Sequence, residues 1–165
     1  MAKSSARAKI SDATLLHLDN QLCFALHSTS RVVIRKYHAA LEAVGVTYPQ
    51  YLVLLVLWEW ERTGWPTPNY LALGKRLDFD SGTLTPLLNR MEASGLIKRT
   101  VPAHDRRERY IKLTAAGRGL KRRLRRVPLT LIENSPVPLA ELLDLRNALL
   151  RLRNALSEPT ADAVP

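Results

Sequence analysis

The segment Leu77–Arg99, LDFDSGTLTPLLNRMEASGLIKR, decides the fold. Its start, Asp78–Gly82, is rich in residues that form tight turns, and the residues after it place leucines and a methionine at helical spacing until Gly95. A short helix is expected before the turn, capped by Thr67 and ending at Leu77. Two short helices joined by a tight turn predict a helix-turn-helix, whose second helix enters the major groove when such a protein binds DNA.

The next residues predict a two-stranded wing. Leu96–Val101 and Arg109–Leu113 are short strand candidates, and the turn between them is rich in charge. A hairpin directly after a helix-turn-helix is typical of a winged helix. The turn carries Arg106 and Arg107, and arginine suits a narrow, electronegative minor groove.

Helical periodicity also covers the chain before this unit. Apolar residues over Asp12–Val44 recur at helical steps, which predicts one long helix that ends at Gly45. Thr47–Pro49 then open a second helix over Gln50–Glu61, whose run YLVLLVLW is apolar nearly all round. We expect this second helix to be the buried centre of the domain.

Two further helices are predicted after the wing. Thr114 caps the first, over Ala115–Arg126, and Pro128 ends it. Leu139–Leu156 form the last helix, with leucines in alternating steps of three and four. The predicted fold is therefore mainly α with a small β wing, a winged helix-turn-helix.

The leucine stripe of the last helix predicts a homodimer. It resembles the seam of a short coiled coil, although packing within one chain would also explain it. DNA-reading proteins of this type commonly pair half-sites by two-fold symmetry. We therefore expect the helices over residues 12–44 and 139–157 to form the dimer.

The net charge is concentrated in one part of the chain. Residues 98–126 hold 12 basic and two acidic side chains, so this segment carries the whole net charge of +10. Such a cluster favours a polyanion, because neutralising phosphates releases counterions. A solvated basic helix is the alternative explanation.

Composition excludes several classes of protein. The 165 residues, 46% hydrophobic and 24% charged, predict one soluble globular domain over residues 1–165. No apolar run is long enough to span a membrane and the first residues lack a signal-peptide pattern, so a cytoplasmic protein is expected. A single cysteine excludes a disulfide within the chain, and the four scattered histidines predict no metal site and no cofactor.

Four long segments resemble the MarR family of winged-helix repressors, specifically its organic-hydroperoxide-sensing OhrR branch. They are Leu18–Arg31, Thr47–Glu59, Leu77–Arg99 and the wing pattern Asp105, Arg106, Arg107 running into Ile111–Gly117. Their order and spacing agree over residues 15 to 156. The resemblance implies a transcriptional repressor, not an enzyme, that binds operator DNA as a homodimer. Its winged helix-turn-helix would cover residues 66–114, and organic hydroperoxide would be its inducer.

The resemblance assigns a sensing role to Cys23. Taken alone, one cysteine on a helix is more often a small buried hydrophobe. In the family this thiol is oxidised by peroxide, and two tyrosines that match Tyr37 and Tyr48 hold it. His27 stands where the branch has a tyrosine. Because there is no second cysteine, the oxidised sulfur needs an external low-molecular-weight thiol.

Helix geometry makes this assignment testable. Cys23 and Tyr37 are 14 residues apart, or about 21 Å along one straight helix, so they cannot touch within one chain. If two copies of the helix cross antiparallel near residue 30, the Tyr37 of one chain faces the Cys23 of the other. Asp19, one turn before the cysteine, would oppose its ionisation if it faced the same way.

The resemblance and the helix-turn-helix together predict the residues that contact DNA. On the second helix they are Ser81, Thr83, Thr85, Asn89 and Arg90. On the wing, Arg107 is expected in the minor groove with Asp105 supporting it, while Arg106 and Arg109 contact the backbone. The plain alternative for each is a helix cap or a solvated side chain.

Two other functions remain open from the sequence. A MarR-type regulator can be released by a small aromatic ligand instead of by oxidation, and replacing Cys23 would leave that release intact. A thiol peroxidase also needs a reactive cysteine. No alternation of strands and helices predicts a peroxidase scaffold here, and such an enzyme has no need of a basic wing.

Overall fold

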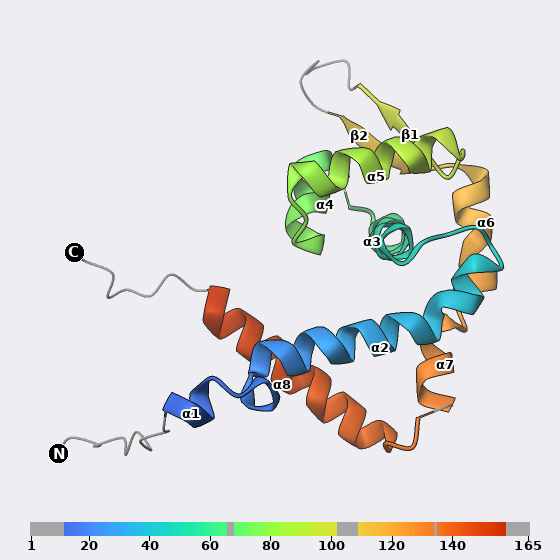
Figure 1. Ribbon diagram of the computed structural model, residues 1–165. Coiled ribbons are helices and arrows are strands. Elements are labelled where there is room, and N and C mark those ends of the chain that lie inside the picture. The colour runs from blue at the N-terminus through green and yellow to red at the C-terminus, as the bar shows by residue number, and fades with distance from the viewer. Residues whose placement is uncertain (1–11, 66–67, 102–108, 134, 158–165) are drawn as a thin grey trace, which may run out of the picture. The chain divides into compact units, whose positions relative to one another are not determined.

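The computed structural model describes residues 12–65, 68–101, 109–133 and 135–157 (Figure 1). Its elements are α1 (Asp12–Leu15), a 3-10 turn (Leu18–Asn20), α2 (Leu22–Glu42), α3 (Tyr48–Thr63), α4 (Tyr70–Leu77), α5 (Ser81–Ala93), β1 (Ile97–Thr100), β2 (Tyr110–Leu113), α6 (Ala115–Leu124), α7 (Val127–Glu133) and α8 (Leu139–Ser157). The chain divides into two compact units, Met1–Arg125 and Arg126–Pro165. Helices dominate and the two strands form one small sheet, which confirms the predicted fold class.

Helix α3 is the buried centre of the first unit, as predicted. Thr47 caps it with a capping box: the Thr47 hydroxyl accepts from the Gln50 N–H at 3.5 Å, and the Gln50 side chain accepts from the Thr47 N–H at 2.9 Å. Its buried side chains are Tyr51, Val53, Leu54, Val56, Leu57, Trp58 and Trp60. Gly64, in the left-handed conformation, ends the helix, and Trp65 beyond it stacks on Trp60.

The helix-turn-helix consists of α4 and α5. Asn69 caps α4, accepting from the Ala72 N–H at 2.9 Å, so the predicted cap at Thr67 was wrong. The helix begins two residues later than predicted, and Thr67 itself lies outside the described residues. Asp80 caps α5 by accepting from the Thr83 N–H at 2.7 Å. The predicted apolar face of α5 is buried, at Leu84, Leu87, Leu88 and Met91.

The wing has the predicted strands. β1 and β2 pair antiparallel, from Ile97 opposite Leu113 to Thr100 opposite Tyr110. Ile97, Ile111 and Leu113 are buried and hold the hairpin on the helices. The turn between the strands, with Asp105, Arg106 and Arg107, lies outside the described residues.

Helix α6 packs tightly behind the wing. Thr114 caps it and donates to the Gly95 carbonyl at 2.6 Å. Gly117 lies against the Leu96 carbonyl so closely that a Cβ would overlap it, and the Trp58 indole donates to the Gly117 carbonyl at 3.1 Å. The helix ends at Leu124. Pro128 does not end it, contrary to prediction, but lies in the first turn of α7, where a proline is tolerated.

The N-terminal region departs from the prediction of one helix over 12–44. The chain breaks between α1 and α2, where His17 and Gln21 have extended backbone conformations. The Asn20 side chain donates to the Thr14 carbonyl at 3.0 Å, and such side-chain bonds to the backbone compete with a continuing helix. Asp19 therefore lies on the 3-10 turn, not on α2, and its carboxylate is 3.9 Å from the His17 Nδ1. No helix of the described ranges has the length and apolar content needed to cross a membrane.

Candidate DNA-binding face and redox site

The exposed half of α5 carries the five DNA-contact residues that were predicted for this helix. Ser81, Thr83, Thr85, Asn89 and Arg90 are exposed, whereas the four apolar side chains of the helix are buried. Helical spacing places Ser81, Thr85 and Asn89 in one row, because each is four residues from the next. The sequence therefore located the polar face of this helix.

Tyr70 on α4 supports the start of this face, and the sequence pattern did not reveal it. Its hydroxyl donates to the Ser81 carbonyl at 3.2 Å and lies 2.8 Å from the Thr85 hydroxyl. The two helices are thereby joined by polar contacts at the exposed end of α5. A tyrosine at the start of the first helix of a helix-turn-helix could have drawn attention to this interaction.

A second unpredicted interaction links α5 to the wing. Glu92 accepts from the Arg99 backbone N–H at 2.8 Å and from the Arg99 Nε at 2.7 Å. The hydrogen bonds from Arg99 hold the pKa of Glu92 below its usual value. Hydrogen bonding to the Thr83 N–H likewise lowers the pKa of Asp80. Both carboxylates are therefore charged near neutral pH, one capping α5 and the other fixing the wing against it.

Arg90 makes a local contact on this face. Its Nε donates to the Pro86 carbonyl one turn earlier at 3.3 Å, so this part of the Arg90 side chain lies along the helix. Arg109, the one predicted wing residue within the described part of the chain, is exposed beside β2.

Two of the predicted thiol-pocket residues come together. The rings of Tyr37 and Tyr48 stack with centroids 6.1 Å apart, and Tyr51 follows 6.5 Å from Tyr48. Burial raises the pKa of Tyr37 and of Tyr48, and it raises the pKa of Tyr51 to about 12. These phenols stay protonated at neutral pH and can donate hydrogen bonds.

Cys23 lies elsewhere in the single chain. It is the second residue of α2 and is exposed, as is His27 one turn later. Tyr37 belongs to the same helix, so about 21 Å of helix separates it from Cys23. One chain therefore gathers the tyrosines but not the thiol.

The chain is similar to transcriptional regulators along most of its length. A family model described as "Transcriptional regulator SarA/Rot" matches residues 35–124. The organic hydroperoxide resistance transcriptional regulator of Bacillus subtilis (strain 168) is 41% identical over 143 residues, which cover 87% of this chain and 94% of the relative. The chain belongs to the MarR family, in its organic-hydroperoxide-sensing branch.

Two further proteins support this placement of the MarR-family chain. The HTH-type transcriptional regulator TtmR of Methylorubrum extorquens (strain PA1) is 43% identical over 139 residues, covering 84% of this chain and 69% of TtmR. The structure of reduced AbfR bound to DNA, a protein of Staphylococcus epidermidis, matches with a TM-score of 0.70 and 32% identity. That match covers 90% of this chain and 100% of AbfR.

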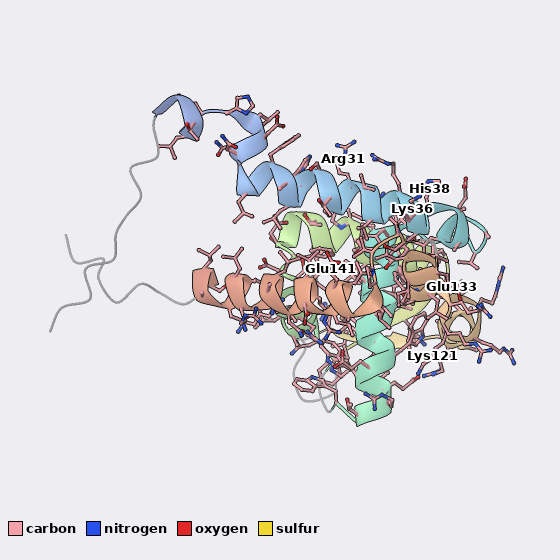
Figure 2. The ribbon with its side chains drawn as sticks, turned by 90° about the horizontal axis from the view of Figure 1, so that it is seen from below. Arg31, Lys36, His38, Lys121, Glu133 and Glu141 are labelled. Atoms are coloured by element: carbon pink, nitrogen blue, oxygen red, sulfur yellow. The ribbon has the colours of Figure 1, made fainter. Side chains whose placement is uncertain are left out.

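The MarR-family chain exposes large apolar side chains on α2 and α8. On α2 these are Leu22, Phe24, Leu26 and Val32, beside polar residues such as Arg31, Lys36 and His38 (Figure 2). On α8 no residue is buried, and Leu145 is 50% exposed. Exposed apolar faces of this extent are typical of surfaces that another protein covers.

Proposed function

We propose that this MarR-family regulator is a repressor that binds operator DNA as a homodimer and leaves it when an organic hydroperoxide oxidises Cys23. The observation that carries the proposal is the α5 face, which presents its polar row on a helix fixed by Asp80, Tyr70 and the Glu92–Arg99 pair. Such a repressor works in the cytoplasm, where its operator is.

The recognition helix supplies the direct contacts to DNA. Ser81 and Thr83, near the start of α5, bind phosphates or base edges, and Arg90 meets the phosphate backbone. On the wing, Arg107 enters the minor groove with Asp105 supporting it, and Arg106 and Arg109 contact the backbone. These roles divide the interface between the sequence-reading helix and the positioning wing.

Two subunits share the sensing site. If the two α2 helices cross antiparallel near residue 30, the partner's Tyr37 comes beside Cys23 and brings Tyr48, which stacks on Tyr37 within each chain. The exposed apolar residues of α2 and the leucines of α8 would be covered in the same dimer. His27, one turn from Cys23, borders this pocket.

The proposed chemistry begins with the Cys23 thiolate. Hydrogen bonds from phenol hydroxyls to the sulfur favour the thiolate, which attacks one oxygen of the hydroperoxide. A sulfur–oxygen bond forms while the oxygen–oxygen bond breaks, and the leaving alkoxide takes up a proton to become the alcohol. The resulting sulfenic acid then reacts with an external low-molecular-weight thiol to give a mixed disulfide and water.

Oxidation would switch DNA binding through the subunit interface. A sulfenic acid or mixed disulfide is bulkier and more polar than a thiol, so it cannot be accommodated in a pocket closed by Tyr37 and Tyr48. Packed interfaces respond by moving between discrete arrangements. Because α2 leads directly into α3, on which the helix-turn-helix packs, the two recognition helices would no longer keep the spacing that matches two half-sites.

Fluorescence anisotropy with the DNA upstream of the protein's own gene tests the proposal. The reduced protein should bind this duplex as a dimer, an organic hydroperoxide should release it, and a thiol reductant should restore binding. Light scattering on the same sample gives the oligomeric state. A reduced protein that stays monomeric, or that binds the duplex no better than a random one, would contradict the proposal.

A non-covalent ligand is the second candidate inducer. An apolar cavity of about 310 Å³, lined in part by Ile34, Leu41, Val46 and Tyr48, is large enough for a small aromatic molecule. Release by such a ligand would persist after Cys23→Ser, whereas release by oxidation would not.

A further inference from the structure

Helix α6 carries positive charge that the recognition helix and the wing do not use. The stretch 115–126 has six basic residues and no acidic one. None of the six belongs to the DNA contacts described above. Their charge therefore needs a separate explanation.

Three of the six basic residues have partners. Arg118 pairs with Glu61 at 2.6 Å, Arg123 donates to the Ala43 carbonyl at 3.0 Å, and Arg126 pairs with Glu133 at 3.3 Å. The first two of these interactions tie the helix to α3 and to the end of α2. Three cations are left to account for.

Lys121, Arg122 and Arg125 form what we call the α6 basic face. All three are exposed, and within the described part of the chain no carboxylate lies within 4.0 Å of their charged groups. Together with Arg118 and Gly119 they line one shallow hollow. Gly119 has no side chain to fill it, and a Cβ there would meet nothing within 4 Å.

The α6 basic face begins where the wing ends. Thr114 and Gly117 hold the start of α6 against the base of the wing, and Arg123 near its other end reaches the end of α2. Figure 1 shows α6 running from the base of the wing toward the end of α2, away from α5. Lys121 on this helix is labelled in Figure 2. The positive surface thus extends from the DNA-reading face along the side of the domain.

We propose that the α6 basic face binds the phosphate backbone of duplex DNA outside the bases that α5 and the wing contact. The proposal rests on the proposed function, because an operator held at the wing places a duplex beside the start of α6. Lys121 and Arg125 are about 6 Å apart along the helix axis, and each DNA strand presents a phosphate about every 3.4 Å of its own axis. Each cation can therefore meet a separate phosphate, without reading sequence.

The test compares duplexes of increasing length. The variant with Lys121→Gln, Arg122→Gln and Arg125→Gln is set against the wild type on a minimal operator and on operators with added flanks. Wild-type affinity should rise as flanks are added, while the variant should bind the minimal operator normally and gain nothing from flanks. On the long duplex the variant's slope of log affinity against log salt should be shallower by about 0.9 for each phosphate it no longer neutralises, or about 2.7 per subunit for three phosphates.

A charge-preserving control separates electrostatics from folding. Arg122→Lys with Arg125→Lys should keep the length dependence, because a lysine also neutralises a phosphate. An identical length dependence and salt slope in the glutamine variant and the wild type would overturn the proposal. So would an equal weakening on the minimal and the long duplex.

A random-sequence duplex distinguishes this proposal from the proposed function. At low salt the wild type should bind it more tightly than the glutamine variant, even if no specific operator binding exists. Absence of specific operator binding alone would contradict the proposed repressor function. Equal binding of both proteins to the random duplex would contradict the proposed role of the α6 basic face.

Discussion

Tyr37 near the end of α2 stacks on Tyr48 at the start of α3, with ring centroids 6.1 Å apart and planes inclined by 30°. This stacking joins the end of α2, the proposed dimer helix, to the start of α3, the buried helix of the DNA-binding part. A displacement of either tyrosine therefore acts on the junction between α2 and α3. Cys23 is on the same helix as Tyr37 but about four turns away, so its thiol cannot reach this junction within one chain.

The tyrosine cluster predicts a late alkaline titration. Burial raises the pKa of Tyr37, Tyr48 and Tyr51, the last to about 12, while an unfolded tyrosine titrates near 10. The neutral phenols therefore stabilise the fold below about pH 10, and this stability is lost as the pH rises through the folded values. Ultraviolet titration should show part of the tyrosine absorbance of the folded protein changing only above the pH at which the urea-unfolded protein ionises. Ionisation of the folded and the unfolded protein over the same pH range would contradict the burial of the cluster.

Two glycines of α6 predict opposite effects on stability. Gly117→Ala places a methyl group against the Leu96 carbonyl and should lower the free energy of unfolding by about 1–3 kcal/mol. Gly119→Ala meets nothing within 4 Å and should raise it by about 0.5–1 kcal/mol, because alanine favours a helix. Urea denaturation of both variants measures the difference. Equal effects would mean that α6 does not pack closely on the base of the wing.

The Glu92–Arg99 pair predicts an acid-dependent contribution. Since the folded pKa of Glu92 is lowered by its bonds to Arg99, its stabilising effect is present above about pH 4.3 and is lost as the pH falls through the folded value. Glu92→Gln should cost up to about 1 kcal/mol at neutral pH, as expected of a well-aligned but partly exposed pair. Denaturation at several pH values should show the gap between variant and wild type closing in acid. A gap that is constant with pH would assign the destabilisation to packing.

The recognition helix is tested by two substitutions on its exposed face. Thr85→Ala with Arg90→Ala should weaken operator binding by about 1–3 kcal/mol and reduce the salt slope by about 1, because Arg90 no longer neutralises a phosphate. Arg62→Ala, an exposed arginine in the last turn of α3, is the matched control and should bind normally. Equal affinity and salt slope in all three proteins would show that α5 does not read the DNA.

Local pattern predicted most of the winged helix. Helix α3 followed from Thr47 and an apolar run, and α5 from its leucine spacing and Gly95. The errors arose where apolar periodicity could not register a competing local bond. The side chain of Asn20 bonds to the backbone and helps to interrupt the expected helix 12–44. Pro128, which was expected only to end the preceding helix, lies in the first turn of α7.

The candidate site was predicted less completely, because its support comes from residues far apart in sequence. Exposure of Ser81 and Arg90 follows from helical spacing, but the interaction of Tyr70 with Thr85 spans 15 residues and two helices. The Glu92–Arg99 pair joins a helix to a strand in the same way. The surroundings of Cys23 depend on a second subunit, which the periodicity of one chain can only suggest.

The most direct test of the central claim compares the wild type with Cys23→Ser at one dose of organic hydroperoxide. Operator binding and the mass of the Cys23 peptide are followed in the same samples. The wild-type protein should leave the DNA in proportion to the oxidised peptide, and Cys23→Ser should bind equally well but stay bound. Release of the Cys23→Ser protein at the same dose would contradict the account and assign release to something other than this thiol.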